Sequence, residues 1–140
     1  MYQKIQIIGH LGNDPQMRYT STGSAVCNFS VAVNRKYTNS KGEIVKETAW
    51  FRVATWGKLA ENCNQYLRKG RQVFVEGRLV PDPNTGGPRV YQRNDGTFGA
   101  SFEVNAITVK FLDNSKASST NVADEAGDIP AGIIEEDIPF

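Results

Sequence analysis

Residues 46–70 read KETAWFRVATWGKLAENCNQYLRKG, a strand pattern that runs directly into a helix pattern. The first part, residues 46–56, is rich in Val, Thr and aromatic residues and alternates in polarity, which predicts a half-buried strand. In residues 58–69 the apolar side chains at 59, 63, 66 and 67 fall on one helical face. Arg68 and Lys69 suit the last turn of this helix and Gly70 suits its end.

Four further segments carry strand patterns. Residues 25–33 alternate over a long run, Ile5-Gln6-Ile7 opens an earlier strand, and residues 71–80 and 100–112 are rich in Val, Ile, Thr and aromatics. Five strands with one helix between the third and the fourth is the element order of the OB-fold. The expected fold class is therefore all-β, a five-stranded Greek-key barrel with one helix and a disordered acidic C-terminal tail.

The chain has 140 residues, and its charge is divided unevenly along its length. Residues 1–112 hold fifteen Lys and Arg against eight Asp and Glu, net +7, whereas residues 113–140 hold one Lys against seven acidic residues, net −6. We expect one domain over 1–112 and a disordered tail over 113–140, which is too polar to offset its ordering entropy. A basic body favours a polyanionic partner. No membrane span or secretory signal is recognisable, so we expect a cytoplasmic, nucleoid-associated protein.

Strand alternation places unusual side chains on the solvent side of residues 46–56. Ala49, Phe51 and Val53 share the face suited to the core, so Trp50, Arg52 and Trp56 must share the other. A nucleic-acid base can stack on an exposed indole for roughly 1 to 3 kcal/mol without regard to sequence, and a guanidinium can neutralise a phosphate. Alternatively, the two tryptophans fill a second core or an oligomer interface.

Aromatic and basic residues are interleaved at two more places. A hairpin is expected around residues 39–42, and residues 81–99 form a long finger whose prolines and glycines exclude it from a central sheet. Basic residues alone more often form a solvated face, but an aromatic beside them at each place is typical of a single-strand groove. The residues concerned are Arg35, Lys36 and Tyr37 in the hairpin and Arg89, Tyr91 and Arg93 in the finger.

The acidic tail has a distinctive tip. Three carboxylates precede an apolar end, and such an end suits a protein pocket with a cationic rim. The tip consists of Glu135, Glu136, Asp137, Ile138, Pro139 and Phe140. It predicts a second partner, a protein, bound separately from the polyanion.

Signals for an enzyme or a metal site are weak. His10 is the only histidine, and no nucleophile motif or GxxxxGK[ST] loop accompanies it, so we expect no catalytic residue and no cofactor. Cys27 and Cys63 form no metal-type pair and lie among apolar residues, which favours buried free thiols over a disulfide or a reactive site. A major-groove recognition helix and a zinc finger are also missing.

Several motifs of the chain closely resemble those of the bacterial single-stranded DNA-binding proteins, over residues 1–112 and again at the tail tip. These motifs are Ile8-Gly9-His10-Leu11-Gly12-Asn13-Asp14-Pro15 with Arg18-Tyr19, Trp50-Phe51-Arg52-Val53, Trp56-Gly57-Lys58-Leu59-Ala60-Glu61, Tyr66-Leu67-Arg68-Lys69-Gly70, Val75-Glu76-Gly77 and Ile138-Pro139-Phe140. The resemblance implies an OB-fold subunit of a homotetramer that wraps single-stranded DNA without marked sequence preference. It also implies tails that recruit replication, recombination and repair proteins.

The resemblance also implies roles for single residues. It implies base stacking by Tyr37, Trp50, Trp56 and Tyr91, and DNA contacts by Lys4, Arg52, Lys58, Arg68 and Lys69. The chain departs from the family at Phe51 and His10, and residues 81–88 resemble an insertion. Two other binding modules compete with this interpretation: an OB-fold replication accessory and a cold-shock-like RNA binder. The acidic Ile-Pro-Phe end argues against both.

Overall fold

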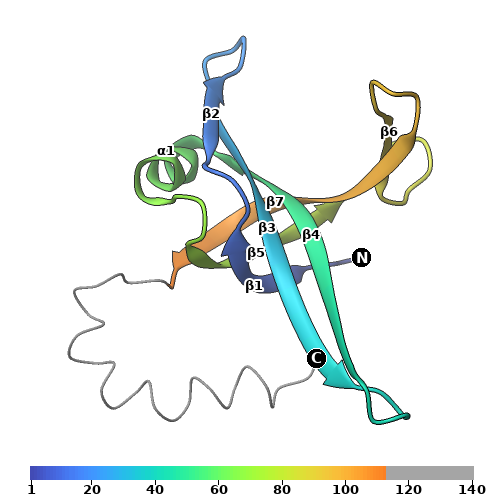
Figure 1. The fold of residues 1–140 in the computed structure, drawn as a ribbon. Helices are drawn as coiled ribbons and strands as arrows, with labels where there is room; N and C mark the ends of the chain where they lie inside the picture. Colours follow the sequence, from blue (N-terminus) through green and yellow to red (C-terminus); the bar gives the residue numbers. More distant parts are fainter. Residues whose placement is uncertain (113–140) are drawn as a thin grey trace, which may run out of the picture. The chain divides into compact units, whose positions relative to one another are not determined.

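The computed structural model describes residues 1–112, so the tail expected over 113–140 and its Glu135–Phe140 tip lie outside the described residues. Along the described residues, seven strands and one helix follow one another (Figure 1). They are β1 (Ile5–Leu11), β2 (Gln16–Tyr19), β3 (Ala25–Thr38), β4 (Ile44–Trp56), α1 (Gly57–Tyr66), β5 (Gln72–Val80), β6 (Arg89–Gln92) and β7 (Phe98–Phe111). Within residues 1–112 no helix has the length and apolarity needed to cross a bilayer.

Five of the strands close into a barrel. The hydrogen-bonded order is β1-β5-β7-β4-β3, and a further pairing between β1 and β3 joins the two ends of this order. The pairing of β4 with β7 is parallel, and β1 with β5, β1 with β3 and β5 with β7 are antiparallel. With α1 between the third and fourth barrel strands, the arrangement is the expected OB-fold.

Two short strands, β2 and β6, lie outside the sequence expectation of five. β2 pairs with the start of β3, with Tyr19 opposite Ala25, and β6 pairs with the start of β7, with Tyr91 opposite Gly99. Each has only four residues, which is too short to give a convincing alternation by itself. The finger expected as a loop over 81–99 is therefore in part a β-hairpin, which Figure 1 shows projecting from the barrel.

The helix is shorter than expected. It ends at Tyr66 and not at residue 69, because Leu67 has the extended backbone angles φ −91° and ψ 149°. Arg68 and Lys69 therefore follow the helix and do not belong to its last turn. Gly70, with φ 89°, donates its N–H to the carbonyl of Leu11 at 2.9 Å and so ties this turn to the end of β1.

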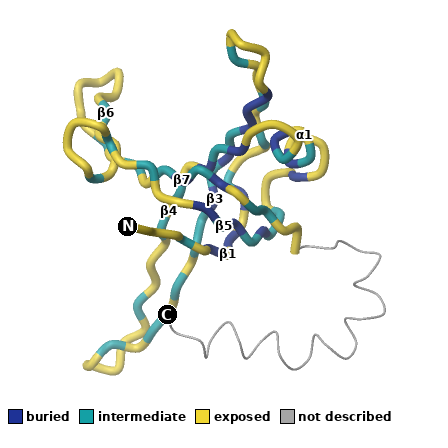
Figure 2. Tube along the Cα trace, turned by 180° about the vertical axis from the view of Figure 1, so that it is seen from behind, coloured by how far each residue is buried: buried dark blue, intermediate teal, exposed yellow. Residues whose placement is uncertain are grey.

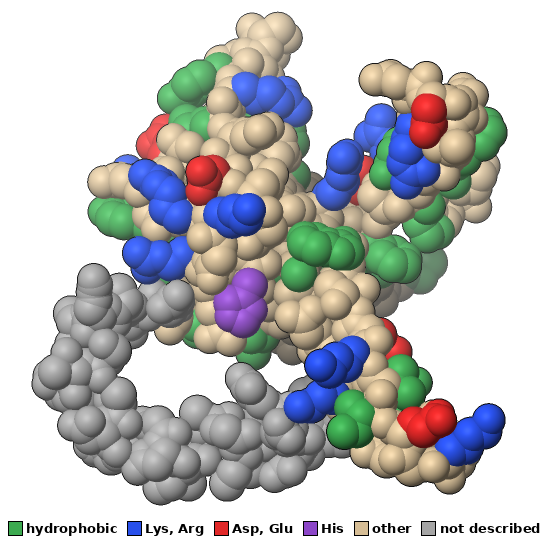
Figure 3. All heavy atoms as spheres, in the orientation of Figure 1, with side chains coloured by type: hydrophobic (Ala, Val, Ile, Leu, Met, Phe, Trp, Pro, Cys, Tyr) green, Lys and Arg blue, Asp and Glu red, His purple; other side chains and the backbone are tan. Residues whose placement is uncertain are grey.

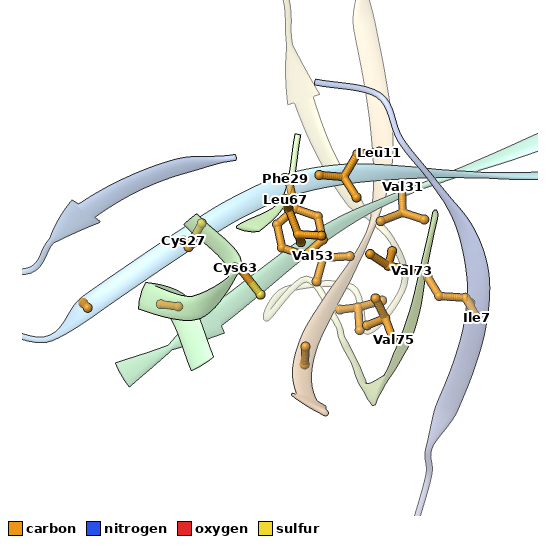
Figure 4. Close-up of a cluster of buried hydrophobic side chains, with 14 residues drawn as sticks. Ile7, Leu11, Cys27, Phe29, Val31, Val53, Cys63, Leu67, Val73 and Val75 are labelled. Atoms are coloured by element: carbon orange, nitrogen blue, oxygen red, sulfur yellow. The ribbon is translucent and has the colours of Figure 1, made fainter. Parts of the chain in front are cut away.

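The core fills the barrel interior. Its most deeply buried side chains come from every barrel strand and from α1, as Figure 4 shows. They include Leu11, Cys27, Val31, Val53, Cys63, Leu67, Val73, Val75 and Val104, each at most 3% exposed. Cys27 and Cys63 are free thiols, as the sequence predicted. Figure 2 shows that burial is concentrated in the barrel and that the β6–β7 hairpin is largely exposed.

Residues 34–49 form a compact unit apart from residues 1–33 and 50–112. This unit is the outer part of the β3–β4 hairpin, and its turn is built by Asn39. The Asn39 side-chain oxygen accepts hydrogen bonds from the N–H groups of Lys41 and Glu43, at 2.8 and 2.9 Å. Gly42 completes the turn with φ 80°, a conformation that favours glycine.

Candidate nucleic-acid interface

The outward face of β4 carries two exposed indoles. Trp50 is 53% exposed and Trp56 is 47% exposed, whereas Val53 and Thr55, on the opposite face, are at most 1% exposed. Arg52 is exposed between the two tryptophans. The face predicted from strand alternation is confirmed, and a second core under these tryptophans is excluded within the described chain. Their role in binding stays a prediction.

Strand pairing extends this face from β4 to β7, and from β7 to β5 and β6. The parallel register places Arg52 beside Glu103 of β7 and Ala54 beside Asn105. On the other side of β7, Arg78 of β5 pairs with Asn105, and along the hairpin Tyr91 pairs with Gly99. Residues directly opposite in a sheet point to the same side. We call the outward side of β4, β5, β6 and β7 at these residues the aromatic face.

Trp50 lies against the backbone of Gly12. A methyl group added at Gly12 would overlap the six-membered ring of the Trp50 indole. The loop that holds Gly12 is itself fixed, since the Asn13 side chain accepts hydrogen bonds from the backbone N–H of Ser30 at 3.0 Å and from its hydroxyl at 3.1 Å. The rest of the Trp50 ring remains open to solvent, as a stacking platform requires.

Trp56 is held by a hydrogen bond. Its indole Nε1–H donates to Oδ1 of Asn105 at 2.8 Å. Asn105 comes from β7, the strand that pairs in parallel with β4. Because the bond engages the edge of the indole, it fixes the ring orientation while the π face stays available.

Tyr91 joins the β6–β7 hairpin to β4 through Arg52, and it contacts a second arginine, Arg93, of its own hairpin. The guanidinium carbons of Arg52 and Arg93 lie 5.7 Å and 5.6 Å from the centre of the Tyr91 ring, a cation–π arrangement. Arg93 is also anchored locally, because it donates to the carbonyl of Phe98 at 2.7 Å. Gly99 lies beneath this cluster, and a methyl group added there would meet both Tyr91 and Arg93.

The hairpin unit 34–49 contains its own aromatic and basic group. The Arg35 guanidinium carbon lies 4.5 Å from the centre of the Tyr37 ring and forms an ion pair with Glu47 at 3.2 Å. The structure therefore brings together Arg35 and Tyr37, two of the three residues that the sequence predicted in this hairpin. The third, Lys36, is exposed and lies between them on β3, so its side chain points to the opposite side of the strand.

Other basic residues of the prediction lie in different surroundings. Lys4 forms an ion pair with Glu76 at 3.6 Å, and a hydrogen bond with Tyr2 and the Glu76 charge raise the pKa of its amine. Arg68 donates to the carbonyls of Asn64 and Leu67, at 3.2 and 2.6 Å, and so satisfies the end of α1. The Lys69 N–H donates to the Asp14 carboxylate at 2.8 Å. Arg89 is exposed on β6, and Lys58 is exposed at the start of α1.

Charge and apolar surface occur together on one side of the molecule. Figure 3 shows hydrophobic side chains over the middle of the side that β3 and β4 present, with Lys and Arg toward α1 and on the β6–β7 hairpin. This combination of charged and apolar surface suits a single nucleic-acid strand, which has an anionic backbone and exposed bases.

No sequence pattern pointed to Arg78 or Asn105, and Tyr19 was noticed only as part of the Arg18-Tyr19 motif, without a role in binding. The structure places each of the three beside predicted residues. Asn105 and Arg78 lie on the aromatic face because of the register in which β7 pairs with β4 and β5. That register is a property of the folded barrel and cannot be predicted from the sequence of one strand. A further signal for Tyr19 was the short alternation of Gln16–Tyr19 before a Ser-Thr-Gly turn.

Within residues 1–112 no group of three or more His, Cys, Asp or Glu side chains is placed to hold a metal ion. Burial raises the pKa of both cysteine thiols, that of Cys63 to about 12. Neither thiol has the lowered pKa and exposure of a reactive cysteine.

Comparison with known proteins gives consistent matches. A model described as the single-strand binding protein family matches residues 2–112. The single-stranded DNA-binding protein 1 of Chlorobaculum tepidum is 47% identical over 91 residues, which cover 63% of this chain and 56% of that protein. The single-stranded DNA-binding protein of Neisseria meningitidis serogroup A is 37% identical over 124 residues, covering 89% of this chain and 67% of that protein. The match thus spans little more than half of the C. tepidum relative.

Solved structures agree with these matches. The Plasmodium falciparum SSB complex with ssDNA aligns with a TM-score of 0.66 and 27% identity, covering 81% of this chain and 97% of that one. The small single-stranded DNA-binding protein from Streptomyces coelicolor aligns with a TM-score of 0.64 at 24% identity, covering 79% and 94%. This second likeness shows the fold.

Proposed function

The chain belongs to the single-strand binding protein family, and from this premise we propose that it binds single-stranded DNA without marked sequence preference. Membership also sets aside the enzymatic alternative, because the family is one of binding proteins. The observation that carries the proposal is the aromatic face, where Trp50 and Trp56 flank Arg52 on one exposed strand surface. Exposed rings stack on any base, which gives affinity without reading sequence.

Electrostatics supports the same proposal. Residues 1–112 carry a net charge of +7, from fifteen basic and eight acidic side chains. A strand of phosphates would release counterions on this surface, so binding should weaken steadily as salt rises. In the proposal Arg52, Arg89 and Arg93 contact phosphates or stack beside the rings, and Lys36 and Arg35 extend the contacts with Tyr37. Lys4, Lys58, Arg68 and Lys69 are further proposed contacts.

Titration of a long thymidine strand, followed by tryptophan fluorescence, tests this proposal. We expect quenching of the indoles, and we expect Trp50→Ala or Trp56→Ala to weaken binding by roughly 1 to 3 kcal/mol with the fold intact. Competition with RNA and duplex DNA of equal length separates the proposal from a cold-shock-like RNA binder. Wild-type affinity in Trp50→Ala protein that melts normally would falsify the stacking role of Trp50.

We further propose that the protein acts as a homotetramer in replication, recombination and repair at the nucleoid. One small barrel offers too little surface to wrap a long strand, and closed symmetry is the usual solution for identical chains. Light scattering at micromolar concentration measures the assembly. A monomeric mass there would contradict the tetramer.

The tail tip, Glu135–Phe140, is proposed to recruit the other proteins of these processes. Its support is compositional: three carboxylates beside Ile138, Pro139 and Phe140 suit an apolar pocket with a basic rim. Removing residues 113–140 takes away a net charge of −6, so DNA affinity should stay equal or rise slightly at low salt. Deleting Phe140 alone should abolish capture of partners and leave DNA titrations unchanged. The reverse pattern would overturn the division of roles.

A further inference from the structure

A hollow open to solvent lies beside Trp56. It has a volume of about 520 Å³, within the range of sites that take small organic ligands. Its wall is formed by the end of β2, the turn into β3 and the first residues of α1. The lining residues are Tyr19, Gly23, Ser24, Ala25, Trp56, Gly57, Lys58 and Glu61.

Two aromatic rings line this hollow, and both remain largely accessible. Tyr19 is 64% exposed and Trp56 is 47% exposed. A tyrosine that gave stability through burial would not leave most of its surface in water. An exposed ring beside a second exposed ring instead provides two surfaces on which a planar, weakly polar group can stack.

The Trp56 ring and the backbone of Tyr19 are held in place before any ligand arrives. Tyr19 is opposite Ala25 in the β2–β3 pair, and the following turn is closed by the Thr20 N–H to the Ser24 carbonyl, at 2.9 Å. Trp56 is fixed by its bond to Asn105, at 2.8 Å. A preorganised indole on one side and a fixed backbone on the other reduce the conformational entropy lost on binding, which favours affinity.

The charges around the hollow favour a base inside it and a phosphate at its rim. Lys58 and Glu61 are 3.9 Å apart, with side chains that are 82% and 49% exposed, so solvent screens the pair and little holds Lys58 to it. Lys58 can therefore turn to a phosphate at the rim. The carboxylate of Glu61 repels a phosphate from the hollow itself but can accept a hydrogen bond from a base N–H.

We propose that this hollow holds one base of the bound single strand, with Tyr19 as a further stacking residue beside Trp56 and Lys58 as the contact to the adjacent phosphate. This inference rests on the proposed function. It adds a ring from β2 to the aromatic face, whose other rings come from β4 and β6. Because the hollow adjoins Trp56, the strand would pass from the aromatic face to the start of α1.

The test uses the full chain and a thymidine oligonucleotide. Tyr19→Ala should weaken binding by about 5-fold to 150-fold, the range of one lost stacking contact. Tyr19→Phe keeps the ring and should stay within about twofold of wild type. Tyr66→Ala is the matched control: Tyr66 is a 55% exposed tyrosine that packs against Phe111 and does not line the hollow, so its loss should leave affinity unchanged. Melting temperatures identify any variant that fails to fold.

Combining Tyr19→Ala with Trp56→Ala tests whether the two rings serve the same base. Neighbouring contacts to one group are not additive, so the double variant should lose less affinity than the product of the two single losses. Full affinity in folded Tyr19→Ala protein overturns the inference but not the proposed function. Strictly multiplicative losses also overturn it, because the rings then bind different nucleotides. Failure of the wild-type chain to bind the strand overturns the proposed function itself.

Discussion

Asn105 holds a ring that contacts DNA in our proposal, so a change at this residue should act through Trp56. We expect Asn105→Leu to weaken binding of single-stranded DNA several-fold, because the indole loses its 2.8 Å bond and its fixed orientation. Loss of the hydrogen bond donated by the Trp56 indole N–H costs about 1 kcal/mol, the usual net contribution of such a bond. Fluorescence titration at constant salt measures the effect.

Trp56→Phe supplies the control for this prediction, because phenylalanine has no N–H to donate. In the Trp56→Phe background, Asn105→Leu should change affinity by less than twofold. An undiminished effect in that background would mean that Asn105 acts on the strand directly.

Gly12 offers a second residue-scale prediction, since a methyl group there would overlap the Trp50 indole. Gly12→Ala should displace the ring and weaken DNA binding, with a shift of the tryptophan emission in the free protein. Gly87→Ala is the matched control: the nearest atom to its added methyl group is 3.8 Å away, in ordinary contact. If both variants bind DNA as the wild type does, the packing of Trp50 against Gly12 is not required for DNA binding.

At the scale of the element, the β6–β7 hairpin is linked to β4 by the contact between the Tyr91 ring and the Arg52 guanidinium, and Arg93 of the hairpin contacts the same ring. Tyr91→Leu removes both cation–π contacts, so it should weaken DNA binding and speed amide hydrogen exchange over residues 89–101. Tyr91→Phe keeps the ring face and should preserve both properties. Arg89→Gln, a change on the same strand outside this pair of ring contacts, should lower affinity without altering exchange.

Elements long enough to show a period could be predicted from sequence, and shorter ones could not. β4 has thirteen residues and alternates between more exposed and more buried positions from Thr48 to Trp56, where its inward and outward faces are as expected. β2 and β6 have four residues each and depend on the strand beside them. The sequence predicts that α1 ends at residue 69, three residues beyond its actual end, because Leu67 is apolar and fits the helical spacing. In the structure Leu67 reaches the core from an extended backbone.

The candidate interface divides in the same way. Alternation along one strand is visible in the sequence, and it places Trp50, Arg52 and Trp56 on the same face. Asn105 and Arg78 join them through the pairing of β4, β7 and β5, whose register depends on barrel closure. Tyr19 reaches the hollow because β2 pairs with β3. The four residues of β2 are too few to predict this pairing from sequence.

For the whole molecule, the buried thiols predict how stability depends on pH. Burial raises the pKa of Cys63 from 9.0 to about 12 in the folded protein, and it raises that of Cys27 as well. Between these values the unfolded chain has lost the proton and the folded chain retains it, so the free energy of unfolding falls as pH rises from about 9 toward 12. Melting temperatures from pH 8 to 11 should decline accordingly.

Cys63→Ala tests the origin of that decline, because it removes one of the two thiols. The variant should be less stable at pH 7, where it loses packing, but its melting temperature should fall less steeply above pH 9. Equal slopes for variant and wild type would assign the alkaline loss to other groups.

Closure of the barrel through β4 and β7 joins residues 51–54 to residues 102–105. On a ribosome, β4 would therefore be complete about fifty residues before its partner is made. During that interval the edge of β4 and the side chains beneath it have no native partner, which is a state prone to misassembly. Folding of the domain should therefore be late and cooperative, completed only when β7 has left the exit tunnel. Nascent chains arrested before residue 105 should remain sensitive to protease.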